Sequence, residues 1–252
     1  NCSFNNAYGA YSIHFDSGSG DVIFRNCQLY GWNSFGSSLN SVTFENCTLE
    51  GNGHYALIRS YADLNMSDCT VDTTNANHDD VYDEGVQAIE PATFTQNNVT
   101  YIVSNDVDLK NVLEQGGDVV LESDFTIDET ESNGYGKTGI NMNNGGTLDG
   151  NGNELGAPGS TGTWDSAINT SGGTIKNITV SQGFRGIFIK KDNNHNEKLY
   201  LDNVTIDGTT YTISCDSGNG LGLEATNSTF KGWTSYAATL GNAKFVDCYF
   251  GY

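Results

Sequence analysis

The stretch Phe44-Glu45-Asn46-Cys47-Thr48-Leu49 decides the fold, because variants of it recur along the chain. Each variant places Asn or Asp after an apolar and a polar residue, and then continues with a small residue, a polar residue and an apolar one. The recurring Asn or Asp positions are Asn26, Asn46, Asp68, Asn177, Asn203, Asn227 and Asp247. Within the first three and within the last four, successive positions are 20 to 26 residues apart. An internal repeat of this length indicates a solenoid.

The repeat is typical of one coil of a parallel β-helix. Its short strands alternate inward apolar with outward polar residues. Asn or Asp suits the turn between two strands, because its side chain bonds local backbone and it tolerates left-handed dihedral angles. Stacked coils would place these residues in a ladder in which neighbouring amides bond each other. Only two prolines occur, which fits a structure that needs its backbone N–H groups. A leucine-rich repeat fits less well, because the spacing varies and no helical segment occurs in each unit.

Five of the six cysteines occupy the slot that follows the Asn or Asp, namely Cys2, Cys27, Cys47, Cys69 and Cys248. Other copies hold Ile, Val or Ser in this slot, so it is a small buried site rather than a place that needs a disulfide. We expect reduced, stacked core cysteines. Several Asn-x-Ser/Thr sequences also occur, and the ladder accounts for those at 46, 177, 203 and 227.

A second, longer repeat is superimposed on the first. Residues 31–35 and 44–49 recur as residues 232–236 and 245–250, an offset of 232 − 31 = 201 in both cases. The sequence therefore predicts two tandem copies, 1–95 and 96–252, cut from a longer array, the second being truncated at its C-terminal end. The first range ends in an acidic linker, because residues 75–98 lose the pattern and contain Asp79, Asp80, Asp83 and Glu84.

A short strand–helix–strand element opens the second copy. Residues 101–103 predict a strand, and Asn105-Asp106 would cap a helix that Gly116-Gly117 ends. Strands follow at 118–121 and 125–127. We expect this element to cover the open end of the second β-helix, which would otherwise expose unpaired backbone and apolar interior.

Composition excludes several classes of function. The 252 residues contain 11 Lys and Arg against 31 Asp and Glu, a net charge of −20. Such a surface repels phosphate backbones, so we expect no nucleic-acid partner. No apolar run approaches the roughly 18 residues of a membrane helix, so we expect no membrane insertion. The acidity is better interpreted as keeping a long β stack soluble.

The segment Gly146-Thr147-Leu148-Asp149-Gly150-Asn151-Gly152, the Asn-x-Thr turns and the Gly-Trp-Thr-Ser-Tyr element at 232–236 carry a resemblance. They resemble repeats of right-handed parallel β-helix (pectin-lyase-like) proteins, including surface proteins of gut bacteria and phage fibre or structural proteins. The resemblance implies an all-β, right-handed parallel β-helix and an extracellular location on a virion or a bacterial cell surface. That fold carries lyases, depolymerases, adhesins and spacers alike, so the function has to come from the sites.

An enzyme of this class would be a polysaccharide lyase or depolymerase. The resemblance implies a carboxylate cluster for Ca²⁺ and an Arg or Lys as base, for which Arg185 is the candidate. No paired carboxylates stand near Arg185 in the sequence. Asp149, Asn151 and Asn153 resemble the start of a Ca²⁺ loop, but Glu154 stands where that loop needs Gly. We therefore favour a plain turn and expect no cofactor, with Ca²⁺ as the alternative.

Trp32 and Trp233 occupy equivalent positions in the two copies. They are candidates for stacking on carbohydrate, although packing is the favoured interpretation. Regular repetition without a concentrated catalytic group predicts a non-enzymatic structural or adhesive fibre module, and the enzyme assignment stays open. The alternatives are the lyase or depolymerase and a non-catalytic glycan-binding module. Expected partners are a cell-surface glycan or surface protein, and neighbouring copies in an array or homo-oligomer.

Overall fold

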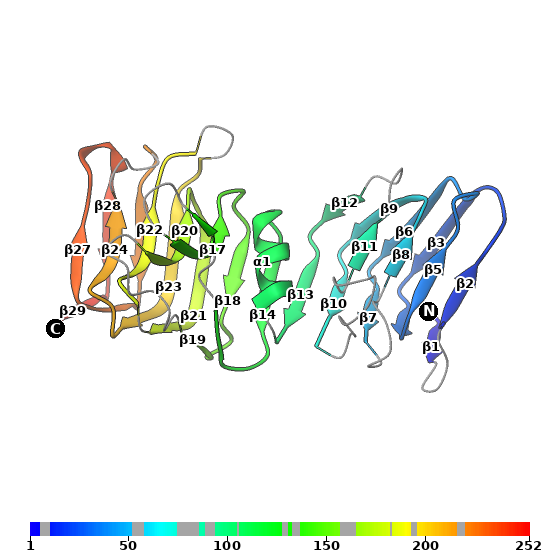
Figure 1. Cartoon of the computed structure of the whole chain (residues 1–252), viewed down its shortest axis with the longest axis horizontal. Coiled ribbons are helices and arrows are strands. Elements are labelled where there is room, and N and C mark those ends of the chain that lie inside the picture. Colours follow the sequence, from blue (N-terminus) through cyan, green and yellow to red (C-terminus); the bar gives the residue numbers. More distant parts are fainter. Residues whose placement is uncertain are drawn as a thin grey trace. The chain divides into compact units, whose positions relative to one another are not determined.

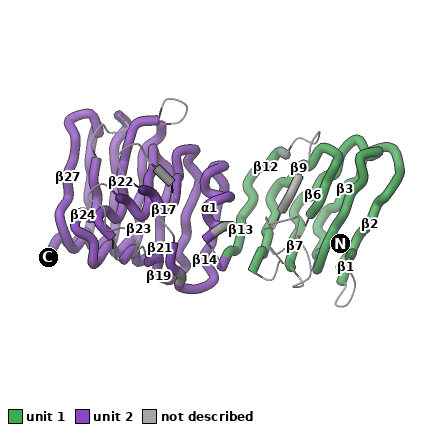
Figure 2. Tube along the Cα trace, viewed as in Figure 1, with its two compact units in different colours: residues 1–103 green, residues 104–252 purple. Residues whose placement is uncertain are grey.

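The computed structural model describes residues 1–5, 11–51, 58–74, 86–88, 94–104, 106–127, 131–132, 137–156, 165–181, 183–192, 196–215 and 220–252. It confirms the predicted fold class. The protein is all-β, with parallel sheets arranged as a β-solenoid of about 8 turns (Figure 1). The chain forms two compact units, residues 1–103 and 104–252, where the sequence predicted copies at 1–95 and 96–252 (Figure 2).

The first unit consists of three parallel sheets, and each of its first four coils contributes one strand to each sheet. The first sheet contains β1 (Ser3–Asn5), β4 (Gln28–Tyr30), β7 (Thr48–Glu50), β10 (Thr70–Asp72) and β13 (Thr100–Val103). The second contains β2 (Ile13–Phe15), β5 (Asn33–Phe35), β8 (Ile58–Ser60) and β11 (Val86–Ala88). The third contains β3 (Asp21–Arg25), β6 (Ser41–Glu45), β9 (Asp63–Ser67) and β12 (Phe94–Asn97).

The solenoid pattern continues further along the first unit than the sequence indicated. β11 pairs with β8 and β12 pairs with β9, both parallel, although residues 75–98 were expected to lose the pattern. Backbone pairing sustains these strands despite the weak apolar alternation of their sequence. The acidic residues Asp79, Asp80, Asp83 and Glu84 lie outside the described residues.

The core of the first unit lies between the three sheets. In-register pairing places Phe24 beside Phe44 and Phe44 beside Met66. The two phenyl rings stack with centroids 5.0 Å apart. Leu29, Leu49 and their neighbours on the first sheet are buried in the same way. Burying each such side chain stabilises the folded state by about 1.5–3 kcal/mol. This burial favours stacking of equivalent apolar positions from coil to coil.

The second unit also consists of stacked coils, and its longest strands have nine residues. Its central sheet contains β14 (Asp118–Leu121), β18 (Thr147–Asp149), β21 (Gly173–Ser181), β23 (Leu199–Asp207), β25 (Leu223–Thr226) and β28 (Ala243–Val246). Beside these run β15 (Phe125–Thr126), β19 (Glu154–Gly156), β26 (Thr229–Lys231) and β29 (Tyr249–Gly251), and β21 and β23 extend across both rows. The remaining sheet contains β16 (Glu131–Ser132), β17 (Lys137–Met142), β20 (Ser166–Thr170), β22 (Arg185–Ile189), β24 (Tyr211–Cys215) and β27 (Trp233–Ser235). A 3₁₀ turn, η1, covers Ala238–Leu240.

The predicted helix is present as α1 (Asp106–Glu114). It packs against β14 and β17, the strands of the first coils of the second unit, and buries Leu109 and Leu113 completely. Gly116 ends it with φ of 76°, a left-handed value that glycine adopts without strain. The helix therefore covers the starting end of this unit, as the strand–helix–strand pattern predicted.

Candidate functional site

A ladder of Asn and Asp residues occupies one corner of the coils in both units. Nine of them have left-handed φ values between 51° and 55°: Asn26, Asn46, Asp68, Asn98, Asn151, Asn177, Asn203, Asn227 and Asp247. All seven positions that the repeat predicted are included. Sequence reasoning missed Asn98 and Asn151. Asn98 begins the sequence Asn-Val-Thr-Tyr, which matches the repeat. At Asn151 the following Gly152 departs from the repeat and obscures the match.

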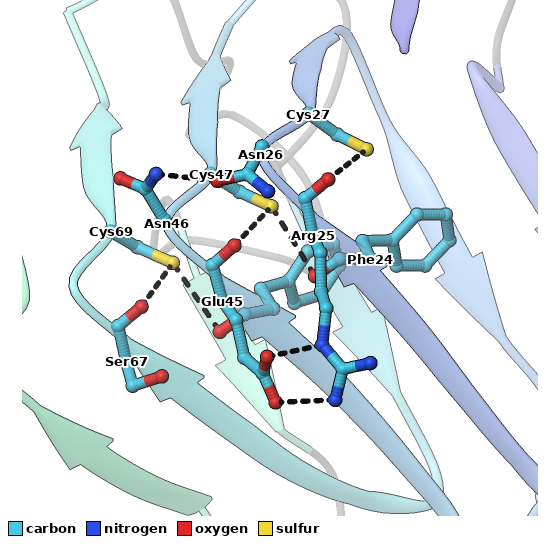
Figure 3. A network of polar contacts seen from close by, with 10 residues as sticks. Phe24, Arg25, Asn26, Cys27, Glu45, Asn46, Cys47, Ser67 and Cys69 are labelled. Carbon is cyan, nitrogen blue, oxygen red and sulfur yellow. Dashed lines mark hydrogen bonds and ion pairs between the residues drawn. The ribbon is translucent and has the colours of Figure 1, made fainter. Parts of the chain in front are cut away.

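Side-chain amides join the ladder from coil to coil. Nδ2 of Asn46 donates to Oδ1 of Asn26 at 2.6 Å, as Figure 3 shows. Nδ2 of Asn98 donates to Oδ1 of Asp68 at 2.7 Å. In the second unit, Nδ2 of Asn203 donates to Oδ1 of Asn177 at 3.1 Å. Each bond runs from a later coil to an earlier one, so the ladder links neighbouring coils at their turns.

The cysteine slot forms a buried column beside the ladder (Figure 3). The thiols in the five repeat slots are free, and those of Cys27, Cys47 and Cys69 are buried. Sγ of Cys47 donates to the carbonyl oxygen of Glu45 at 3.3 Å, and Sγ of Cys69 donates to that of Ser67 at 3.2 Å. Burial raises the pKa of both thiols. They are protonated packing groups rather than nucleophiles.

Ion pairs connect the outward faces of adjacent coils. Arg25 holds both carboxylate oxygens of Glu45, with Nη2 3.2 Å from Oε1 (Figure 3). In the second unit, Glu224 lies between two cations, with Nζ of Lys198 at 2.7 Å and Nζ of Lys244 at 2.9 Å. Their hydrogen bonds lower the pKa of Glu224 to about 2. Many of the few Lys and Arg side chains therefore link neighbouring coils.

The candidate catalytic residue Arg185 lies in the interior of the second unit. It begins β22 and is only 2% exposed. Its Cζ lies 4.5 Å from the ring centroid of Phe188, which is also buried. Its strand neighbours in register are Ser166 and Tyr211. This position gives the guanidinium a packing role and no open surface on which to meet a polymer.

The calcium candidates Asp149, Asn151 and Asn153 are engaged in contacts between coils. The carboxylate of Asp149 accepts the Asn151 N–H at 2.9 Å and Nδ2 of Asn177 at 3.1 Å, and Nζ of Lys176 lies 3.2 Å away. Burial acts to raise the pKa of Asp149, but these hydrogen bonds outweigh it and the pKa is lowered. Asn151 is a ladder residue, and Nδ2 of Asn153 donates to the carbonyl oxygen of Leu121 at 3.0 Å. Across the described residues, no group of three or more His, Cys, Asp or Glu side chains is placed to hold a metal ion.

The two equivalent tryptophans have different surroundings. Trp32 is 5% exposed, with the Tyr11 ring stacked at 4.1 Å and Cζ of Arg59 at 4.8 Å from its ring centroid. Trp233 is 59% exposed and borders a hollow of about 430 Å³ with Thr234 and Phe250. Trp32 therefore packs between residues of its own unit, whereas Trp233 presents an aromatic face that a sugar ring could contact.

A hollow of about 250 Å³ that the sequence did not reveal lies on the sheet of β2, β5 and β8. It is lined by His14, Asp16, Ser34, Arg59 and Tyr61, among others. These residues come from three successive coils and are up to 47 positions apart in the chain. No sequence motif contains them, and only the stacking of coils brings them together.

Comparison with known proteins finds no matching family model, no matching curated protein and no matching solved structure. Within the described part of the chain, no helix has both the length and the apolar character needed to cross a membrane.

Proposed function

We propose that this chain is a non-enzymatic structural and adhesive module that displays side chains on a stiff β-helix. The observation that carries the proposal is the repeated linkage of neighbouring coils. Backbone pairing, the Asn ladder and ion pairs such as Arg25–Glu45 all join one coil to the next. Rigid strands of this kind hold surface side chains in fixed relative positions, which suits multivalent adhesion.

The placement of the candidate catalytic groups supports this proposal over a lyase. Arg185 is buried against Phe188, and the carboxylate of Asp149 is held by Lys176 and Asn177. A catalytic base has to reach the proton that it removes, and a lyase metal site needs carboxylate oxygens that face its substrate. Both groups instead serve the contacts of the solenoid.

The resemblance to pectin-lyase-like proteins supports a place on a phage virion or a bacterial cell surface. In the segment that carries the resemblance, Asn151 forms a ladder turn, and Gly150 lies against the next coil. A Cβ on Gly150 would lie 2.5 Å from the carbonyl oxygen of Asn177. The partners that we propose are a cell-surface glycan or surface protein, and neighbouring copies of the module. The exposed face of Trp233 favours the glycan among them.

Two assays on the purified chain test the proposal. In the first, the chain is incubated with pectins, alginates and capsular polysaccharides, and unsaturated products and new reducing ends are measured. We expect no product; robust release that co-purifies with the protein would overturn the non-enzymatic assignment. In the second, binding to immobilised surface glycans and to intact bacteria is measured. Binding supports the adhesive role, and its absence from every surface would remove that role.

A further inference from the structure

Three cysteines of the first unit form a column of buried thiols, one on each of three successive coils. Cys27, Cys47 and Cys69 are 7%, 2% and 2% exposed, and their thiols are free. The backbone holds these coils together, because the Thr48 N–H donates to the carbonyl oxygen of Cys27 and the Thr70 N–H to that of Cys47, both at 2.9 Å. Figure 3 shows the three side chains following one another from coil to coil.

The thiols of this column have the same orientation in each coil. Sγ of Cys47 lies 3.3 Å from the carbonyl oxygen of Glu45 in its own coil and 3.5 Å from that of Phe24 in the previous coil. Sγ of Cys69 makes the equivalent two contacts, at 3.2 and 3.5 Å. Sγ of Cys27 also donates to the carbonyl oxygen two residues before it, at 3.2 Å. Because the contacts repeat, successive sulfur atoms are displaced by one coil, which is about 4.7–4.9 Å for neighbouring parallel strands.

This spacing is too long for a disulfide and suits a metal ion between two sulfur atoms. A disulfide needs sulfur atoms about 2.05 Å apart and Cβ atoms about 3.5–4.5 Å apart. A zinc–thiolate bond is about 2.3 Å long, so two metal–sulfur bonds of that length in line span about 4.6 Å. Side chains stand roughly perpendicular to a sheet, so an ion between two stacked sulfur atoms meets each Cβ–Sγ bond at about a right angle.

The chemistry of the column selects a soft cation that needs few ligands. Thiolates are soft ligands, whereas tetrahedral Zn(II) needs more than two of them. In the part of the chain that the structure describes, no group of three or more His, Cys, Asp or Glu side chains is placed to hold a metal ion. When a divalent ion binds two thiols, two S–H bonds break, two metal–sulfur bonds form and two protons pass to solvent. The filled site is then neutral, which an apolar interior favours.

The column has a route to solvent at Cys27. A hollow of about 570 Å³ lies against the ladder at this end of the unit, and it is lined by Cys27, Asn26, Asn46 and Thr48, among others. A metal ion is smaller than an alkylating reagent, so it can enter between stacked side chains that exclude such a reagent. The neighbouring thiols of the column lie directly behind Cys27.

We propose that this column binds one soft metal cation in line between the sulfur atoms of two neighbouring coils. Cys47 is one ligand, and Cys27 or Cys69 is the other. Only one ion binds, because the lone pairs of the Cys47 thiolate do not point in opposite directions and cannot serve an ion on each side. The inference goes beyond the proposed adhesive function and does not depend on it.

Hg(II) and methylmercury distinguish a site with two sulfur ligands from isolated thiols. Hg(II) has two coordination positions in line, whereas methylmercury has one. Both are titrated, with glutathione in excess, into the whole chain carrying Cys2→Ser, which removes the exposed thiol of the preceding coil. We expect one retained Hg(II) per chain, measured by native mass spectrometry and by sulfur-to-mercury absorption in the ultraviolet, and no retained methylmercury. Equal retention of methylmercury, or loss of Hg(II) to glutathione, would overturn the proposal.

Serine variants in the same background test the position of the ligands rather than their number. Cys47→Ser leaves Cys27 and Cys69 two coils apart, about 9.5 Å, which one ion cannot span. It should weaken Hg(II) binding by about 100-fold or more, the advantage of a second ligand held in place. Cys27→Ser and Cys69→Ser are the matched controls, because each also removes one thiol but leaves a neighbouring pair and should retain binding. Equal weakening in all three variants, or none in a folded Cys47→Ser protein, would refute the column as the site.

Serine fits this slot of the repeat. Ser228 occupies it in the second unit, is 2% exposed, and donates from Oγ to the carbonyl oxygen of Thr226 at 2.7 Å. Circular dichroism checks that each variant is folded. If Cys47→Ser does not fold, X-ray absorption at the mercury edge of the Cys2→Ser protein decides: we expect two sulfur neighbours, and one alone or three or more would overturn the in-line site. Loss of this site would leave the adhesive function standing, because the adhesion assays contain no metal.

Discussion

Substitutions of the ladder residue Asn46 should reverse the usual order of alanine and glycine. Asn46 has φ of 51°, and its Nδ2 donates to Asn26 at 2.6 Å. In ordinary strand conformations, glycine is about 0.5–1 kcal/mol less stable than alanine because of its backbone entropy. At left-handed φ the Cβ of an L-residue costs about 1–2 kcal/mol, a penalty that glycine avoids.

The magnitudes follow from these two terms and from the lost side-chain bond. Asn46→Ala loses an exposed hydrogen bond and acquires the left-handed penalty, which together destabilise the first unit by about 2 kcal/mol. Asn46→Gly loses the same bond but not the left-handed conformation. It should be about 0.5–1 kcal/mol more stable than Asn46→Ala. The sign of this difference is the test, because the individual sizes depend on context.

Urea unfolding monitored by Trp32 fluorescence measures the effect in the correct unit. Trp32 is buried in the first unit, so its emission reports the unfolding of that unit, provided that the other two tryptophans are replaced by Phe in all proteins compared. A chain with two units need not unfold in a single transition, and one local reporter avoids that difficulty. Free energies are compared only where the denaturant slopes agree.

Thr43 provides the matched control. It lies on β6, three residues before Asn46, in the middle of a strand and half-buried. There Thr43→Ala should be more stable than Thr43→Gly, the opposite order to that at position 46. If alanine were also the more stable residue at position 46, the ladder would not depend on left-handed turns, and the argument from the repeat to the fold would fail.

Three further predictions concern charge and thiols. The pKa of Glu224 is lower in the folded protein than in the unfolded chain, so its stabilisation is complete above the unfolded pKa and is lost as the pH falls. The stability of the second unit should therefore drop between about pH 5 and 2, and it should drop less steeply in Glu224→Gln. Acid titration followed by circular dichroism measures both. Equal slopes in both proteins would contradict the linkage. Alkylation followed by mass spectrometry should label the exposed Cys2 rapidly and Cys47 only after unfolding; rapid labelling of Cys47 in the native protein would rule out the buried column. A double-mutant cycle on Arg25 and Glu45 should give a coupling energy that falls as salt is raised, because both side chains are exposed; a coupling that salt leaves unchanged would argue for a desolvated pair.

The repeat by itself determines the fold class. The pattern around Asn46 specifies which residues face inward, where the chain turns and which backbone conformation the turn needs. These properties depend on neighbouring residues alone, so each copy of the repeat specifies them. The ladder positions that it missed, Asn98 and Asn151, are those where neighbouring residues dilute the pattern. At Asn98 the weak strand before it hid the match, and at Asn151 an inserted Gly did so.

The surroundings of individual side chains were decided by the tertiary structure. Trp32 and Trp233 are equivalent in sequence, yet one is 5% and the other 59% exposed, because exposure depends on what the adjacent elements cover. Arg185 is buried for the same reason, although its sequence neighbours gave no indication of it.

The hollow around Arg59 required the coils to stack in one particular register. His14 and Ser34 are separated by 20 residues and Ser34 and Arg59 by 25, so differing coil lengths have to be absorbed at the turns before the three align. The sequence by itself determined a stack of coils with an Asn ladder, because periodic local preferences are written into every repeat. Only the tertiary structure decided which outward residues meet, because register between coils is a long-range property.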